Sequence, residues 1–206
     1  TCAHMFINLG VNMQNLFMVD SKGVITTARI PTLTTEKIPF AKDTSSTTLK
    51  DIIQHADVFV GLSQANIFTP DMLNSMTTNP IVFAMANPAP EIDYHLALKT
   101  RSDVIMATGR SDLPNQINNV LAFPYLFRAA LDTRATTINP EMKLACIRAL
   151  MKLAHSKVPS KVQEIYNQEL NFGPLYILPK PFDPRVLSEV TPAIAKAAME
   201  SGAAQI

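Results

Sequence analysis

Four carboxamide side chains occur within five residues of this chain, at Asn115, Gln116, Asn118 and Asn119. Carboxamides donate and accept hydrogen bonds without carrying charge, so this group suits the binding of a carboxylate or an amide. A long apolar segment follows directly, at residues 120–131. The pattern predicts a binding loop that leads into a buried helix. Helix capping is an alternative for Asn118 and Asn119, although four amides exceed the need of one cap.

Asp20 is a second candidate, because it ends the apolar segment 15–20. In dinucleotide-binding folds, an acid at the end of the second strand accepts hydrogen bonds from the adenosine ribose, about 20 residues after a glycine-rich loop. The six glycines of the chain do not form that loop. We therefore expect the first strand and the glycine loop to precede Thr1. The alternative is that Asp20 is an ordinary turn acid.

The two residues after Asp20 bear on the choice of cofactor. The hydroxyl of Ser21 and the ammonium group of Lys22 are suited to contact a ribose 2′-phosphate, whereas the carboxylate of Asp20 would repel it. The local chemistry therefore leaves both NAD and NADP open. The alternative for Lys22 is a solvated turn lysine.

Two further polar residues follow predicted strands. Ser63 ends the apolar segment 57–63, and Asn87 follows the apolar segment 80–86. Open α/β sheets bind their ligands outside the carboxyl ends of the strands. We therefore expect Ser63, Asn87 and the carboxamides near residue 119 to meet at one crevice. Alone, Asn87 before a proline is also a common turn former.

The composition of the chain and the motifs that it lacks exclude several other classes of protein. The 18 Lys and Arg residues nearly balance the 17 Asp and Glu residues, so no strong field attracts nucleic acid or anionic lipid. No apolar run approaches the roughly 20 residues that span a bilayer. Cys2 and Cys146 lie far apart, without metal-ligand spacing, which fits a reducing compartment and favours the cytoplasm. The four histidines lack partner carboxylates, and we assign no catalytic residue and no metal ligand.

Short apolar segments alternate with helical patterns in the first two thirds of the chain. The predicted strands are residues 15–20, 57–63, 80–86 and 104–107, and the predicted helices between and before them are residues 1–9, 47–55, 70–76 and 91–99. This alternation predicts an α/β fold with a Rossmann-like, doubly wound parallel sheet. A helical C-terminal part should follow, with helices at 120–131, 140–155, after Pro159 and at 184–201, and with an extended segment at 172–183.

Five segments of the chain, in unbroken order, resemble malic enzymes of the bacterial type. They are residues 19–23, 86–91, 108–132, 134–139 and 179–185. Residues 26–38 match that family only loosely. The resemblance implies that residues 1–132 are a partial NAD(P)-binding domain, and that residues 133–206 are a helical extension packed on the same domain.

The resemblance also implies an activity. The intact enzyme would oxidise (S)-malate at C2 by hydride transfer to NAD or NADP and would then form pyruvate and CO2, with Mg or Mn as the metal. Asn87 and Asn119 occupy positions that match the family's cofactor or substrate contacts, and Asn118 lies beside them. The proton-transfer residues and metal ligands of the family match no position here, so the chain alone should be inactive. A homodimer or higher homo-oligomer is implied by analogy.

Two alternatives remain open from the sequence. One is another dinucleotide-dependent dehydrogenase of the amino-acid dehydrogenase type, which would share the fold but not the substrate. The other is a non-catalytic α/β binding module.

Overall fold

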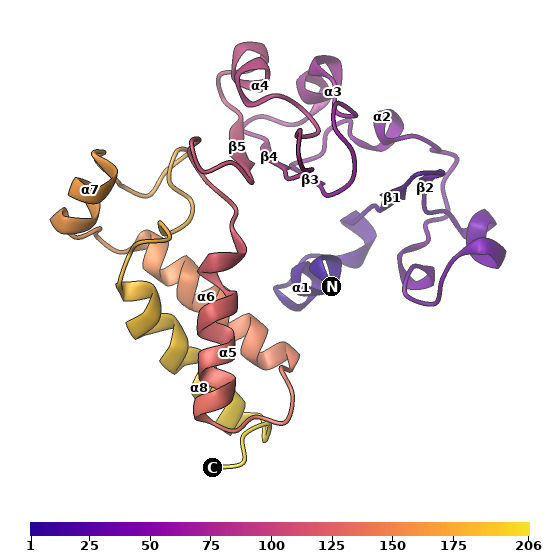
Figure 1. The fold of residues 1–206 in the computed structure, drawn as a ribbon. Coiled ribbons are helices and arrows are strands. Elements are labelled where there is room, and N and C mark those ends of the chain that lie inside the picture. Colours follow the sequence, from indigo (N-terminus) through magenta and orange to yellow (C-terminus); the bar gives the residue numbers. More distant parts are fainter.

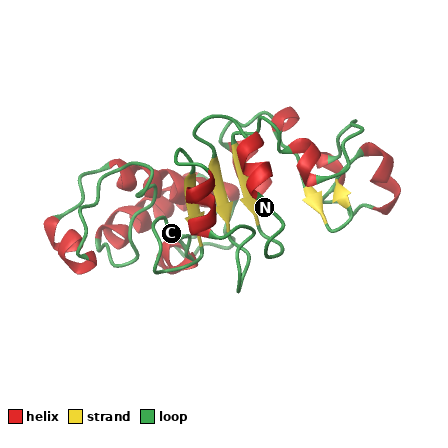
Figure 2. Cartoon of the chain, turned by 90° about the horizontal axis from the view of Figure 1, so that it is seen from above, coloured by secondary structure: helices red, strands yellow, loops and turns green.

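The computed structural model describes all 206 residues and has three parts along the chain (Figure 1). An N-terminal part holds α1 (Cys2–Asn8) and a small two-stranded sheet. A central part holds a three-stranded sheet, and a C-terminal part consists of helices. Seen from above, the two sheets are separate and helices lie beside the central one (Figure 2).

The central sheet is parallel, as the alternating pattern predicts. Its strands are β3 (Val58–Gly61), β4 (Ile81–Ala84) and β5 (Ile105–Thr108), in the order β3-β4-β5. Two helices connect them, α3 (Pro70–Ser75) and α4 (Tyr94–Thr100), and the short helix α2 (Leu49–Ile52) precedes β3. The parallel α/β architecture is thus confirmed, with three strands in this sheet.

The connecting helices begin at side-chain caps. The Thr69 hydroxyl accepts a hydrogen bond from the Met72 amide at the start of α3, where Pro70 occupies the first turn. Asp93 caps α4 by accepting from the Leu96 amide. These caps fix where each helix starts, and therefore the length of the loop between each strand end and its helix.

One face of the central sheet is covered by α3 and α4. Phe59, Val82 and Met106 project from the three strands into a core shared with Leu73 of α3 and Ala97 of α4. The alternate residues on the opposite face are mostly half-buried, and Val58 is 41% exposed. The strands are therefore fully covered on one face only, whereas their apolar sequences predict burial on both.

The predicted strand at 15–20 is wrong in length and in pairing. Only β1 (Val19–Asp20) is extended, and it pairs antiparallel with β2 (Gly23–Val24) rather than joining the central sheet. The Lys22 amide donates to the Asp20 carboxylate at 3.0 Å, which stabilises the tight reversal between them. Residues 13–15 form a turn of 3₁₀ helix instead of strand. Local turn chemistry therefore overrides the apolar pattern.

The C-terminal helices pack on one another. They are α5 (Phe123–Asp132), α6 (Pro140–His155), α7 (Ser160–Tyr166) and α8 (Thr191–Glu200). α6 has the predicted bounds and is capped by Asn139. The predicted helix 184–201 instead begins with a π-helical turn, Val186–Val190, before α8. Pro192 explains the change, because it has no amide hydrogen to continue a regular α-helical ladder.

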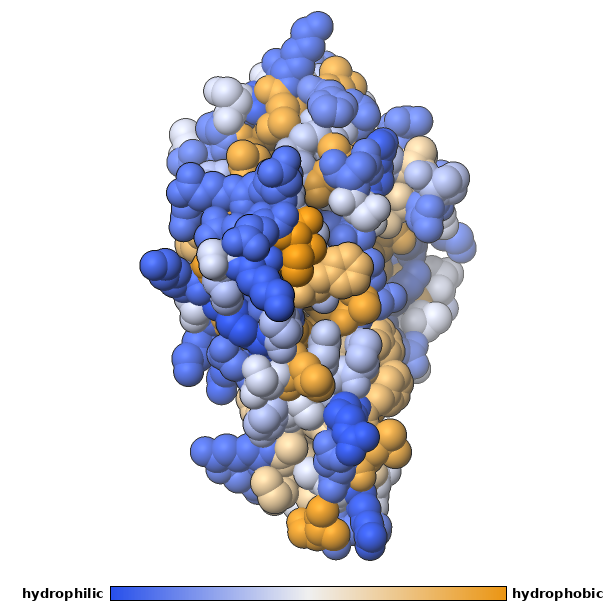
Figure 3. All heavy atoms as spheres, turned by 60° about the vertical axis from the view of Figure 1, so that its left-hand side comes forward, coloured by the Kyte–Doolittle hydropathy of each residue, from blue (hydrophilic) through white to orange (hydrophobic).

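The helical part has its own apolar core. Ala129 of α5, Met142 and Cys146 of α6, and Ile194 and Ala198 of α8 are buried together. Other apolar groups stay outside it: on the face that Figure 3 brings forward, hydrophobic groups lie exposed among hydrophilic ones. No helix of the chain has both the length and the apolar character needed to cross a membrane.

Asn115 connects the central sheet to the C-terminal part. Its Nδ2 donates to the Met106 carbonyl of β5 at 2.9 Å and to the Pro174 carbonyl at 2.7 Å. Its Oδ1 accepts from the Ile177 amide at 2.9 Å. The residue is only 3% exposed and has a left-handed backbone with φ of 54°. This one side chain therefore joins segments about 60 residues apart in the sequence.

Candidate functional site

Three polar segments meet at one edge of the central sheet. Ser63 follows β3, Asn87 follows β4, and residues 116–119 return to the end of β5, where the Ile117 amide donates to the Thr108 carbonyl at 2.8 Å. Because neighbouring parallel strands end at the same edge, these segments lie on one side of the sheet. Ser63, Asn87 and the backbone of Ile117 therefore lie at the carboxyl ends of three neighbouring strands, and Asn119 follows Ile117 by two residues.

The side chains of Ser63, Asn87 and Asn119 are exposed, and they make no hydrogen bond within the chain. Each retains its full capacity to donate and accept. Three unpaired polar side chains at the carboxyl ends of three strands form a set of groups that a polar ligand could engage.

The neighbouring carboxamides have structural functions. The Asn118 Oδ1 accepts from the Val120 amide at 3.0 Å and caps a 3₁₀ turn, Asn119–Leu121. Its Nδ2 remains unpaired and can still donate. Asn115 is buried, and its side chain makes three hydrogen bonds to the backbone. Among the carboxamides of this segment, Asn115 thus connects two parts of the chain and Asn118 caps a turn, whereas the side chain of Asn119 is free to bind a ligand.

The predicted residues Asp20, Ser21 and Lys22 lie elsewhere, on the β1–β2 hairpin. Ser21 and Lys22 are exposed at its turn. Because this hairpin belongs to a separate sheet, no strand pairing connects it to the β3–β5 edge. The structure therefore yields two separate groups of candidate residues rather than one.

Asp20 is held by two cations that the sequence analysis missed. Both of its carboxylate oxygens accept from the Arg29 guanidinium, at 2.8 and 3.0 Å, and one also accepts from Lys37 at 2.8 Å. Burial raises the pKa of Asp20, but the hydrogen bonds from Lys37 and Arg29 together lower it by more than burial raises it. The pKa of Asp20 therefore lies well below the usual range. The partners are nine and 17 residues away in the sequence, a spacing that no short motif reveals.

Replacing Asp20 by asparagine is expected to destabilise the chain most at neutral pH. Because the folded-state pKa of Asp20 is lowered, its ion pairs stabilise the fold above the ordinary aspartate pKa of about 4, and this contribution is lost as the pH falls below that value. The difference in melting temperature between the wild type and Asp20→Asn should therefore narrow from about pH 6 to about pH 3. Thermal unfolding at several pH values measures it, with the exposed Asp43→Asn as the control. If the difference in melting temperature between the wild type and Asp20→Asn stays constant over this pH range, the ion pairs of Asp20 do not stabilise the fold.

A second residue that the sequence analysis missed is Glu91, which is completely buried below the ends of β3 and β4. Glu91 lies seven residues after the end of β4, and an acid at that distance offers little sequence evidence for this position. Its carboxyl group binds the backbone amides of Ser63 and Ala86, the residue before Asn87.

The chain offers no evident metal site and no activated nucleophile. No group of three or more His, Cys, Asp or Glu side chains is arranged to hold a metal ion. The Mg or Mn ion that the sequence resemblance implies therefore does not fit residues of this chain. Both cysteines are free, and burial raises the pKa of the Cys146 thiol to about 11, which keeps it protonated.

The chain is similar to known malic enzymes in sequence. The family described as malic enzyme, NAD binding domain matches residues 8–168. The NADP-dependent malic enzyme of Escherichia coli (strain K12) is 49% identical over 205 residues, which cover 98% of this chain and 27% of that protein. The NADP-dependent malic enzyme of Halomonas elongata is 50% identical over 205 residues, which cover 99% of this chain and 48% of that protein. The chain thus spans less than half the length of these relatives.

The fold agrees with the sequence match. The crystal structure of the Entamoeba histolytica malic enzyme superposes with a TM-score of 0.85 at 28% identity, over 100% of this chain and 41% of that chain. The similarity therefore includes the C-terminal helices as well as the central sheet. Since the family match also extends over most of the residues, the chain belongs to the malic enzyme NAD-binding domain family.

Proposed function

We propose that this chain is the NAD(P)-binding part of a malic enzyme, an oxidoreductase that converts (S)-malate to pyruvate and CO2. The observation that supports the proposal most directly is the group of unpaired side chains of Ser63, Asn87 and Asn119 at the carboxyl ends of β3, β4 and β5. Ligands of open α/β sheets bind at this edge. Family membership favours this function over an amino-acid dehydrogenase or a non-catalytic module.

The chemistry of the side chains suggests how they would act. When bound, a nicotinamide cofactor supplies the acceptor for the hydride that leaves C2 of malate. The carboxamides of Asn87, Asn118 and Asn119 would bind the polar groups of cofactor and substrate, by donating to carboxylate or carbonyl oxygens. Ser63 would contact the cofactor from the end of β3. These residues orient the reactants, and none of them is assigned a proton transfer.

The β1–β2 hairpin would bind the adenosine end, and its charge favours NADP over NAD. Arg29 and Lys37 together carry more charge than the single carboxylate of Asp20 can neutralise. Lys22 at the exposed turn adds a third positive charge. An excess of cations attracts a 2′-phosphate, whereas an isolated acid would repel it. NADP is thus the preferred cofactor in this proposal, as the names of the two relatives above also suggest.

The remaining assignments depend on the same proposal. Residues 1–132 would form the partial nucleotide-binding domain and residues 133–206 the helical extension, with α5 at the end of the first part packed on the helices of the second. Mg or Mn would be held by ligands other than the residues of this chain, since they form no metal cluster. The two free cysteines suit the cytoplasm. A homodimer or higher homo-oligomer would be the working form.

The isolated chain is expected to bind dinucleotide weakly and to leave malate unchanged. Titration with NADP+ or NAD+, followed by amide NMR, should give a Kd of about a millimolar, with NADP+ the tighter ligand. Shifts should concentrate at Ser63, Asn87, Asn119 and the β1–β2 hairpin. Incubation with malate, Mn and either cofactor should form no pyruvate, because the residues assigned here orient reactants and transfer no proton.

Two results would contradict this proposal. If neither nucleotide shifts the amides at the strand ends at millimolar concentration, the cofactor site is wrongly assigned. If the chain alone forms pyruvate rapidly, the proposal that it supplies only part of the catalytic apparatus fails.

A further inference from the structure

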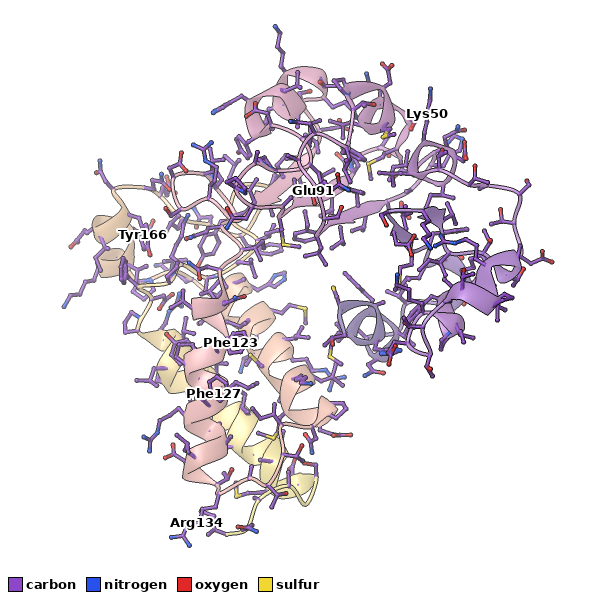
Figure 4. The ribbon with its side chains drawn as sticks, turned by 45° about the vertical axis from the view of Figure 1, so that its right-hand side comes forward. Lys50, Glu91, Phe123, Phe127, Arg134 and Tyr166 are labelled. Atoms are coloured by element: carbon purple, nitrogen blue, oxygen red, sulfur yellow. The ribbon has the colours of Figure 1, made fainter.

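The carboxyl group of Glu91 connects the backbone after β3 to the backbone after β4. Glu91 is 0% exposed. Its Oε1 accepts from the Ser63 amide, and its Oε2 accepts from the Ala86 amide, both at 3.0 Å. Figure 4 shows Glu91 in the interior of the central part. Each of its oxygens thus holds a backbone amide directly at, or directly before, a proposed ligand-binding residue.

The backbone around Glu91 reinforces this connection. The Glu91 carbonyl accepts from the Phe68 amide at 3.0 Å, and the Pro90 carbonyl accepts from the Asn66 amide at 3.1 Å. The loop after β3 therefore runs along the segment that follows β4. Pro90 and Glu91 hold this loop at both ends. Their backbone carbonyls bind the amides of Asn66 and Phe68, and the Glu91 carboxyl group binds the Ser63 amide.

Gly61 makes room for this carboxyl group. A Cβ atom at Gly61 would lie 2.3 Å from the Glu91 carboxyl carbon, which is closer than atoms can approach. The φ angle of Gly61 does not require glycine, so the absence of a side chain is explained by the space that Glu91 fills. The last residue of β3 and the carboxyl group thus fit together as a pair.

A buried carboxylate is costly unless its oxygens are bonded, and here each oxygen receives an amide. An apolar residue of similar size would fill the space, but it would leave the amides of Ser63 and Ala86 without an acceptor. The contact therefore fixes the distance between the two strand-end loops rather than only filling the core.

We infer that Glu91 is a positioning residue, which holds the Ser63 and Asn87 side chains at the spacing that a dinucleotide requires. The inference rests on the proposed function, since it assigns Glu91 to the support of that site. Glu91 itself is buried and touches no ligand. Its effect on binding is transmitted through the two backbone amides.

The test compares Glu91→Gln and Gly61→Ala with the wild-type chain. Glutamine keeps the size of the side chain but turns one acceptor into a donor that faces an amide hydrogen. Gly61→Ala keeps the Glu91 carboxyl group but displaces it. This variant therefore provides the comparison with the wild type if Glu91→Gln does not fold. Ile194→Val, in the core of the C-terminal helices, is a mildly destabilising control far from the strand ends.

Two quantities are measured well below the melting temperature of each variant, namely the hydrogen-exchange rates of the Ser63 and Ala86 amides and the Kd for NADP+ by NMR titration. In the wild type, both amides should be protected although they lie outside the strands. In Glu91→Gln and Gly61→Ala, both should exchange about tenfold faster, and the Kd should rise about tenfold. Ile194→Val should leave both quantities unchanged.

The outcomes separate this inference from the proposed function. Faster exchange with an unchanged Kd would show that Glu91 only stabilises the fold, which overturns the positioning role. If the Ser63 and Ala86 amides exchange at the same rate in the variants as in the wild type, the Glu91 carboxyl group does not hold them, and the inference fails. A wild-type chain whose strand-end amides do not respond to NADP+ would contradict both the proposed function and the positioning role.

Discussion

Replacing Asn115 by alanine is expected to lower the free energy of unfolding by about 3 kcal/mol, because it leaves buried backbone groups without their partner. The Pro174 carbonyl and the Ile177 amide would lose the side chain that connects them to β5. Alanine is also disfavoured in the left-handed backbone conformation of this position. For a chain of this size, the melting temperature should fall by roughly 10 °C.

Thermal or denaturant unfolding measures the effect, and Asn167→Ala is the matched control. Asn167 is also a left-handed asparagine, but it is exposed and its side chain makes no hydrogen bond, so its substitution changes only the backbone preference. An equal loss of stability in both variants would show that the hydrogen bonds of Asn115 contribute little.

In the complete enzyme, Asn119→Ala is expected to lower kcat/KM for malate about 100-fold. Removal of one well-placed hydrogen-bond donor from an active site has an effect of this order. The Asn119 side chain is exposed and makes no hydrogen bond within the chain, so the melting temperature should change little. The effect should therefore be one on catalysis or binding, without loss of folded protein.

Steady-state kinetics with malate and NADP+ checks this expectation, and Asn74→Ala is the control. Asn74 is an exposed asparagine on α3, outside the strand-end segments. Its replacement should leave kcat/KM unchanged. An unchanged kcat/KM in Asn119→Ala would remove Asn119 from the proposed site.

The parallel sheet and its helices could be predicted because their evidence is local. Short apolar runs become β3, β4 and β5, and Thr69 with Pro70 marks the start of α3. The same logic gives the bounds of α6 from the Asn139 cap. Topology alone puts Ser63 and Asn87 at the same edge, since residues that follow neighbouring parallel strands share it.

The rest depends on partners that are distant in the sequence. Asp20 looks like a free acid until the fold places Arg29 and Lys37 against it. Asn115 looks like a ligand-binding amide, but its acceptors include Pro174, 59 residues away. Glu91 ends one of the segments that resemble malic enzymes, but that segment does not reveal that its carboxyl group binds the amides of Ser63 and Ala86. In each case the identity of the residue is visible in the sequence, whereas its bonding partner is set by tertiary structure.

The half-covered face of the central sheet has a thermodynamic consequence. Val60, Phe83 and Ile105 lie on the face opposite α3 and α4, and part of their apolar surface remains in water. Each square ångström of such surface withdrawn from water is worth about 25 cal/mol. Any segment or molecule that settles on this face only in the folded state will raise the melting temperature by mass action. The melting temperature of the chain without such a partner is thus lower than its melting temperature with the partner bound.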